Sequence, residues 1–265
     1  MMDRDSKPDI SGTGTSRILS RLAGFIEELD SVLREMRVGS ENILYQVARL
    51  DLALQVLEAA KATLLLRLST VPRTNWTTAR FAFESMHDLF YLLKLCPDRR
   101  AVGAKIYVGA MVGRKRAKGR LRRIRATREG NATKQDPSLR EFIRAEAKRI
   151  EEIDPGAEQA ICQALKETLA SGEHHWSGMA RRQMTKLIRE KLDDPELAAG
   201  WDASYYALSL HAHPKFRLDD AIRIGPAGFE YSPDTPDDTA CYAASVAVQT
   251  TLLLLGEHMA PFTDG

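Results

Sequence analysis

Apolar residues recur every three or four positions along most of this chain of 265 residues. Between residues 16 and 38 the repeating side chains are Leu19, Leu22, Ile26, Leu29 and Leu33. This spacing follows the 3.6-residue period of an α-helix and places all five side chains on one face. Helices with one apolar face are stable only when those faces are buried against each other. The sequence therefore predicts an all-α fold, a multi-helix bundle.

A second long helix is expected from Glu41 to Leu68, after a break at Gly39 and Ser40. Ser40 is a candidate cap, because its hydroxyl can accept a bond from an unpaired amide at the helix start. The apolar stripe of this helix is Ile43, Val47, Leu50, Leu54, Leu57, Leu64 and Leu68. At 1.5 Å per residue the helix would be roughly 40 Å long. Such a length suits the spine of a bundle or the seam of a dimer.

The remaining helices are expected at 76–95, 98–127, 137–153, 157–170, 177–192, 195–210 and 239–258. Four glycines weaken the 98–127 helix, so a break near Gly113 is expected. Near 221–231, two short β-favouring runs flank a Gly-Pro-Ala-Gly turn, which predicts a short β-hairpin. We expect a disordered tail at 1–15 and a single all-α domain at 16–265. That domain would consist of a long helical hairpin (16–70) and a helical bundle (76–258).

The composition, 44% apolar and 28% charged, is that of an ordinary globular protein. Three widely spaced cysteines offer no zinc motif and no disulfide framework, which favours a cytoplasmic location. The polar N-terminus has no apolar segment of the kind found in signal peptides. Residues 239–256 carry no charge but are short for a bilayer span, so a buried core helix is favoured over a membrane helix. No cofactor is predicted.

Positive charge is concentrated between residues 99 and 128, where twelve Lys or Arg occur without an acid. The whole chain carries +2, so the remainder carries −10. This asymmetry is typical of a protein with an anionic partner, and nucleic acid is one candidate. The expected binding residues are Arg114, Lys115, Arg116, Lys118, Arg120, Arg122, Arg123 and Arg125. The alternatives are a solvated face balanced by acidic groups elsewhere, or a membrane-surface contact.

The expected 76–95 helix carries a polar stripe beside its apolar one. Arg80, Glu84, His87 and Tyr91 are spaced to lie on one face. An arginine can hold a phosphate and a histidine can transfer a proton near neutral pH, which suits phosphodiester chemistry. Arg80, Glu84 and His87 are therefore candidate catalytic residues. The alternative is a buried ion pair with a structural role.

Four of the six histidines and two of the three tryptophans fall within residues 173–214. His213 lies just before Pro214, at the end of the 195–210 helix, and is the fourth candidate catalytic residue. His211 and His213 would bind a metal only if a third ligand joined them, so no metal is predicted. The alternative is that Trp176, Tyr205, Tyr206 and His211 pack between helices.

Several short motifs recur in one known group of proteins. They are the run Arg80-Phe-Ala-Phe-Glu84 leading into Leu-Phe-Tyr-Leu-Leu, then Trp176, and later Tyr206, Ser209, His213 and Pro214. This combination resembles a family of uncharacterised bacterial all-helical proteins that is distantly similar to HEPN domains. Arg80 and His87 also fit the Arg-x(4–6)-His pattern of HEPN ribonucleases, although Phe81 replaces the polar residue usual after the arginine.

The resemblance covers residues 76–258 and implies a helical bundle without an established activity. It implies that Arg80, Glu84, His213, Trp176 and Tyr206 come together. Combined with the basic segment, it leads us to expect a protein that binds or cleaves RNA, in a stress or phage-defence setting. The alternative is a non-enzymatic scaffold or regulator that dimerises through the 41–68 helix, with a structural Arg-Glu-His network. A homo-oligomer is expected, and no motif specifies the substrate.

Overall fold

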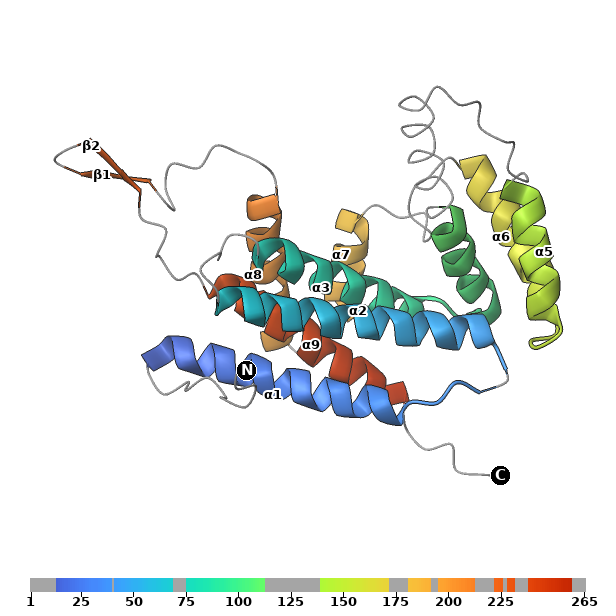
Figure 1. Cartoon of the computed structure of the whole chain (residues 1–265), viewed down its shortest axis with the longest axis horizontal. Coiled ribbons are helices and arrows are strands. Elements are labelled where there is room, and N and C mark those ends of the chain that lie inside the picture. The colour runs from blue at the N-terminus through green and yellow to red at the C-terminus, as the bar shows by residue number, and fades with distance from the viewer. Residues whose placement is uncertain are drawn as a thin grey trace, which may run out of the picture. The chain divides into compact units, whose positions relative to one another are not determined.

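The computed structural model is helical over almost all of the residues that it describes (Figure 1). Those residues are 13–39, 41–68, 75–112, 139–171, 181–191, 195–212, 222–225, 228–231 and 238–258. The prediction of an all-α bundle is confirmed. The helices are α1 (Thr13–Glu35), α2 (Ile43–Arg67), α3 (Asn75–Phe90), α5 (Leu139–Glu151), α6 (Ala157–Ser171), α7 (Arg181–Lys191), α8 (Pro195–Ala212) and α9 (Thr239–His258).

Four further elements are described. A π-helical turn, η2 (Tyr91–Leu95), directly follows α3, and residues 99–112 are helical. Strands β1 (Ile222–Gly225) and β2 (Gly228–Tyr231) form a two-stranded antiparallel ladder in which Ile222 faces Tyr231. Helix α1 begins at Thr13, inside the segment predicted as a disordered tail, because a single glycine at position 14 costs an amphipathic helix only about 1 kcal/mol.

The chain groups into two compact units, each assembled from separated segments. Unit 1 comprises Met1–Glu35, Leu52–Phe90 and Ile188–Gly265, and unit 2 comprises Met36–Asp51 and Tyr91–Leu187. The first turns of α2 and most of α7 therefore belong to unit 2, and the rest of these two helices belongs to unit 1. The single domain over 16–265 stays a prediction.

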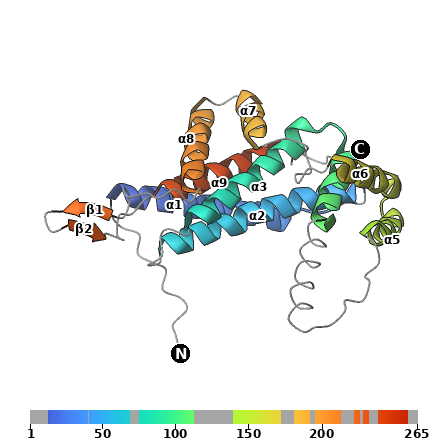
Figure 2. The same cartoon turned by 90° about the horizontal axis from the view of Figure 1, so that it is seen from above.

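Unit 1 is organised around α9, which packs against α1, α3 and α8 (Figures 1 and 2). The apolar stripe predicted for α1 is buried from Leu19 to Leu33, and the stripe of α3 is buried from Ala79 to Phe90. Full burial of one large apolar side chain contributes roughly 1.5–3 kcal/mol, so these two faces supply much of the stability of the unit. Here the helical period of the sequence identified the buried faces.

Helix α9 holds the described stretch that is long and apolar enough to cross a membrane, Thr239–Gly256, with a mean hydropathy of 1.4. Of this stretch, 67% is buried inside the fold. Its buried face is made largely of small residues, including Ala240, Ala243, Ala244 and Ala247. Small side chains let neighbouring helices approach α9 closely, and the helix lies in the core of unit 1 as predicted.

The apolar stripe predicted for α2 is not the buried face of the helix, although one of its members, Leu57, is buried. Val47, Leu54 and Leu68 are 47, 38 and 49% exposed. The buried face is lined mainly by Ala48, Leu52, Ala53, Val56, Ala59, Ala60 and Thr63. Leucines occur on more than one side of this helix, so a 3/4 spacing can be traced along two faces. The face with small side chains is the one that packs.

Unit 2 has a separate core between α5, α6 and the helix over 99–112. It is formed by Ala104, Val108, Val112, Ile143, Ala147, Ala157, Ile161, Ala164 and Leu165. The turn between α5 and α6 contains Gly156 at a φ of +91°, a conformation that residues with a Cβ atom rarely adopt. This glycine therefore allows α5 and α6 to fold back on each other.

Gly103 marks a close approach between two helices of unit 2. A Cβ atom added there would lie 2.5 Å from the backbone nitrogen of Tyr45 and 2.9 Å from the carbonyl carbon of Leu44. Both neighbours are backbone atoms of the first turn of α2, which cannot move aside as a side chain can. A residue that weakens its own helix thus allows two helices to pack backbone to backbone.

Candidate functional site

The polar stripe predicted on α3 divides into a half-exposed pair and a buried ring. Arg80 Nε donates to Glu84 Oε1 at 2.8 Å, and the two side chains are 38% and 33% exposed. An ion pair of this kind on a helix surface contributes about 0.3–0.5 kcal/mol. The His87 side chain is fully buried. Arg80 and Glu84 are therefore open to solvent, whereas the His87 ring is not.

His87 lies in an aromatic cluster contributed by α3 and α8. Its ring stacks on Trp201, with 4.8 Å between centroids and an interplanar angle of 14°. Phe83 meets the imidazole edge to face at 4.9 Å, and the Tyr205 ring lies 5.9 Å away. Aromatic contacts of this geometry contribute roughly 0.5–1.5 kcal/mol each beyond the burial of area. The cluster works as a packing unit between two helices.

Trp201 is the residue of this cluster that the sequence analysis did not single out. It heads the largest fully buried side chains of the described chain. Its indole Nε1 and the hydroxyl of Ser204 are buried without a hydrogen-bond partner among the described residues. The available signal was the spacing of Trp201 and Tyr205, one turn apart on α8. Tyr206, by contrast, is 67% exposed.

Several predicted site residues lie outside the residues that the structure describes. These are His213, Trp176 and the whole basic segment over 114–128, from Arg114 to Arg128. Helix α8 includes His211, whose side chain is likewise outside the description. The expected meeting of His213 with Arg80 and Glu84 therefore stays a prediction.

The two units differ sharply in charge. Over the sequence ranges of unit 2 there are 24 Lys or Arg and 13 Asp or Glu, a formal charge of +11. The ranges of unit 1 hold the other 14 Lys or Arg and 23 Asp or Glu, a formal charge of −9. Anionic partners are attracted by the potential of such a positive region. The best described candidate for a binding site lies in unit 2.

A pocket of about 340 Å³ lies between α5 and α6. Arg140 and Arg144, one turn apart on α5, and Lys166 on α6 provide its polar lining. Cys162, Leu165 and Leu169 complete the wall, and no acidic residue lines the pocket. None of the three cations forms an ion pair or a hydrogen bond with another described residue. Three positive charges therefore surround one opening, and no described acid lies against them.

Local sequence explains how these cations reach one pocket. Ile143 and Ala147 form the buried face of α5, and the arginines before and after Ile143 emerge at the border of that face. On α6, Leu165 belongs to the buried face, so the neighbouring Lys166 emerges at the border of that face. Each helix alone has the pattern of a solvated amphipathic helix. Only the packing of α5 on α6 gathers the three cations, which is why the sequence analysis missed them.

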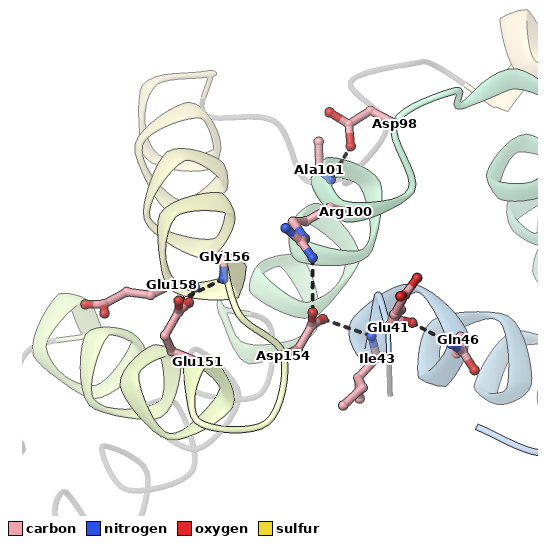
Figure 3. Close-up of polar contacts among 10 residues, drawn as sticks. All are labelled: Glu41, Ile43, Gln46, Asp98, Arg100, Ala101, Glu151, Asp154, Gly156 and Glu158. Atoms are coloured by element: carbon pink, nitrogen blue, oxygen red, sulfur yellow. Dashed lines mark hydrogen bonds and ion pairs between the residues drawn. The ribbon is translucent and has the colours of Figure 1, made fainter. Parts of the chain in front are cut away.

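Polar contacts fix the turn that joins α5 to α6 (Figure 3). The Asp154 carboxylate accepts the N–H of Ile43 at 2.9 Å and a bond from Arg100 Nη2 at 3.3 Å. Its side chain is buried, so both partners offset the loss of hydration. Ile43 is the first residue of α2, so Asp154 caps that helix from a distant segment. The predicted cap, Ser40, lies outside the described residues.

Glu151 stabilises the same turn from inside it. Its two carboxylate oxygens accept the backbone N–H groups of Gly156 at 2.8 Å and Glu158 at 2.7 Å. These two bonds, Gly156 first, hold the pKa of Glu151 below its ordinary value of 4.5. The start of α6 is thus capped by the end of α5, which keeps the walls of the basic pocket in place.

Within the described ranges, no group of three or more His, Cys, Asp or Glu side chains is arranged to hold a metal ion. The three cysteines are free thiols, with Cys241 buried and Cys96 and Cys162 partly buried.

Comparison with known proteins adds no relative. No family model matches the chain, and neither the curated proteins nor the solved structures include one with significant similarity to it. The resemblance to a HEPN-like bacterial family therefore stays an expectation from short motifs. The function must be argued from the residues alone.

Proposed function

We propose that this protein binds the phosphate backbone of RNA through the cations of the α5–α6 pocket in unit 2. The observation that carries the proposal is that Arg140, Arg144 and Lys166 line this pocket without an acidic partner among the described residues. The basic segment over 114–128, which precedes α5 in the sequence, would extend this contact.

The chemistry of the pocket favours phosphate. Arginine presents a planar fork of N–H donors that matches phosphate oxygens, and two arginines one turn apart can engage neighbouring groups of one strand. Phosphate contacts position a strand without reading its sequence. The apolar wall formed by Leu165 and Leu169 offers no aromatic ring for base stacking. We therefore expect binding with little sequence preference.

The test is the affinity of the full chain for a labelled, unstructured single-stranded RNA in low salt. The triple substitution Arg140→Gln, Arg144→Gln and Lys166→Gln should weaken binding by at least about tenfold, because each bond to phosphate is charge-assisted. The matched control is Arg149→Gln on α5. Arg149 points away from Arg140 and is paired with Glu146 at 2.8 Å. Equal affinity of the triple variant and the control would refute the proposal.

RNA cleavage is the less supported part of the expectation. A general acid or base must reach the substrate, and the His87 ring is enclosed by Phe83 and Trp201. Arg80 is already engaged by Glu84. We therefore propose that the protein binds RNA without cleaving it. Cleavage of RNA by the purified protein that disappears in both Arg80→Ala and His87→Ala would reinstate it.

Self-association through α2 is a second candidate function. Leu54, Leu65 and Leu68 project from one side of this helix, and Leu65 is 67% exposed. Large apolar side chains aligned on a helix surface are a common feature of interaction faces. Sedimentation velocity should then show a dimer that Leu65→Glu dissociates, while Val38→Glu, at another exposed apolar site, leaves it intact. A monomeric wild-type protein would exclude this candidate.

A further inference from the structure

The close approach of Gly103 to Tyr45 creates a second arginine cluster in unit 2, separate from the α5–α6 pocket. Arg99 lies one turn before Gly103, and its guanidinium carbon is 5.6 Å from the centroid of the Tyr45 ring. Arg49 follows Tyr45 by one turn on α2. The phenol ring of Tyr45 is buried. Two guanidinium groups thus converge on one rigid aromatic side chain.

Neither arginine has a carboxylate partner among the described residues. Arg49 Nε is buried and makes no hydrogen bond within the described structure. Arg99 contacts the Tyr45 ring and forms no ion pair with a described residue. Burial is the main cause that lowers the pKa of Arg49. The Tyr45 phenol raises that pKa, and the nearby charge of Arg99 lowers it further. Two cations that repel each other beside a buried ring are costly unless an anion joins them.

We propose that Arg49 and Arg99, held around the Tyr45 ring by the Gly103 crossing, bind a phosphate-class oxyanion. Arg49, which is half-buried, would offer the outer N–H groups of its guanidinium and Arg99 the outer edge of its own, so the anion would lie between them. The exposed Arg99 provides the route of entry. The oxyanion is either free phosphate or a phosphodiester group of bound RNA.

A pocket of about 210 Å³ lies on another face of the helix that carries Arg99. Its wall includes Cys96, Tyr91 and Lys105, and neither arginine lines it. Cys96 is also close enough to Tyr45 to contribute to the raised pKa of that phenol, behind burial as the main cause. Asp98 lines the same pocket, but its carboxylate is occupied by the N–H of Ala101 at 2.9 Å. The acid therefore serves as a helix cap and is not a partner of either arginine.

The experiment measures the melting temperature of the full chain against inorganic phosphate, with sodium chloride at matched ionic strength as the reference. A bound anion raises the melting temperature progressively with concentration. We expect this rise in the wild type and in Arg149→Gln, and its loss in Arg99→Gln and Arg49→Gln. Arg99→Lys should retain part of the rise, because it keeps the charge but loses the planar fork. Arg99 is exposed, so its variants test the site even if Arg49→Gln does not fold.

The two sources of the oxyanion give different results. A phosphate-dependent rise that requires Arg99 assigns the site to a free anion. No such rise, together with RNA affinity at least about tenfold weaker in Arg99→Gln than in Arg149→Gln, assigns it to a phosphodiester. A rise that is unchanged in Arg99→Gln overturns the proposal. It is also overturned if phosphate has no effect and RNA affinity is the same in both variants.

Discussion

The two units of this protein differ in how many of their cations are paired with acids. In unit 1 four described cations form ion pairs: Arg80 with Glu84, Arg67 with Asp238, and both Arg34 and Lys61 with Asp30, whereas Arg21 bonds to Gln249. In unit 2, five cations around two sites have no acidic partner within the part of the chain that the structure describes: Arg49, Arg99, Arg140, Arg144 and Lys166. Unit 2 also contains well-paired groups, including Lys105 with Glu167 at 2.9 Å. Its unpaired cations are therefore confined to particular places.

This difference separates structural from functional charge. A paired cation needs no further partner, so Arg80 and Glu84 are explained by the fold alone. An unpaired cation beside a pocket gains most when an external anion arrives. The sequence motifs predict a site on α3 in unit 1. The arrangement of charges in the structure favours a site in unit 2.

The largest predicted effect tests whether the His87 cluster is core. Replacement of Trp201 by Ala should lower the free energy of unfolding by about 3–5 kcal/mol, because a fully buried indole is removed and a cavity remains. Tyr206→Ala, five residues later on the same helix, should change it by less than about 0.5 kcal/mol. Urea unfolding of both variants provides the measurement. Similar losses in the two would mean that the cluster is not the packing centre described above.

The next effect tests the helix crossing on which the second arginine cluster depends. Gly103→Ala should destabilise the protein by roughly 1–3 kcal/mol, because the new methyl group collides with the backbone of Tyr45. Alanine is otherwise the better helix former by about 1 kcal/mol. The control is Gly24→Ala on α1, where an added Cβ meets nothing within 4 Å. We expect the Gly24→Ala variant to be more stable than the wild type. A gain in stability at both glycines would contradict the close approach of Gly103 to the α2 backbone.

A smaller effect is expected where charges are paired at the surface. Arg80→Ala should cost less than about 1 kcal/mol, because both members of its pair are partly exposed. Arg67→Ala should cost more, since Arg67 and Asp238 are each only 15% exposed and 2.7 Å apart. Thermal denaturation of the two variants shows which substitution destabilises the protein more. The reverse order would mean that Arg80 has partners beyond Glu84.

The smallest effect concerns the pH dependence of the α5–α6 turn. The folded pKa of Glu151 is depressed, so its contribution to stability is present above its ordinary value of 4.5 and is lost as the pH falls through the lower folded value. Glu151→Gln should therefore melt below the wild type at pH 7. The difference should shrink as both proteins are acidified, and a difference that grows toward low pH would contradict this assignment.

The sequence predicted the elements of the fold better than their contacts. The buried faces of α1 and α3 followed from the helical period, and α9 begins and ends where expected. The buried face of α2 could not be predicted from the helical period, because this helix has more leucines than one face can bury. The capping of Ile43 by Asp154 joins positions 111 residues apart, and no local pattern indicates such a bond.

The sequence predicted a site with basic residues, but it placed that site in the segment at 99–128 and not at the α5–α6 pocket. A basic, anion-binding character was expected from the run of Lys and Arg at 99–128, and Arg99 belongs to that run. Arg140, Arg144 and Lys166 were missed because each is an ordinary exposed residue of an amphipathic helix. On α3 the spacing of Arg80 and Glu84 predicted an ion pair, which forms but is partly exposed instead of buried. It could not reveal that Trp201 covers His87, since α8 comes from a distant part of the chain.

The central claim is that the unpaired cations of unit 2 bind phosphate. Its most direct test is the salt dependence of single-stranded RNA binding, compared between the wild type and the triple variant Arg140→Gln, Arg144→Gln and Lys166→Gln. Each phosphate contact adds about 0.7 to the slope of log affinity against log salt concentration, so the loss of three contacts should reduce the slope by roughly 2. Arg149→Gln should leave it unchanged. A triple variant with the wild-type slope would contradict the account.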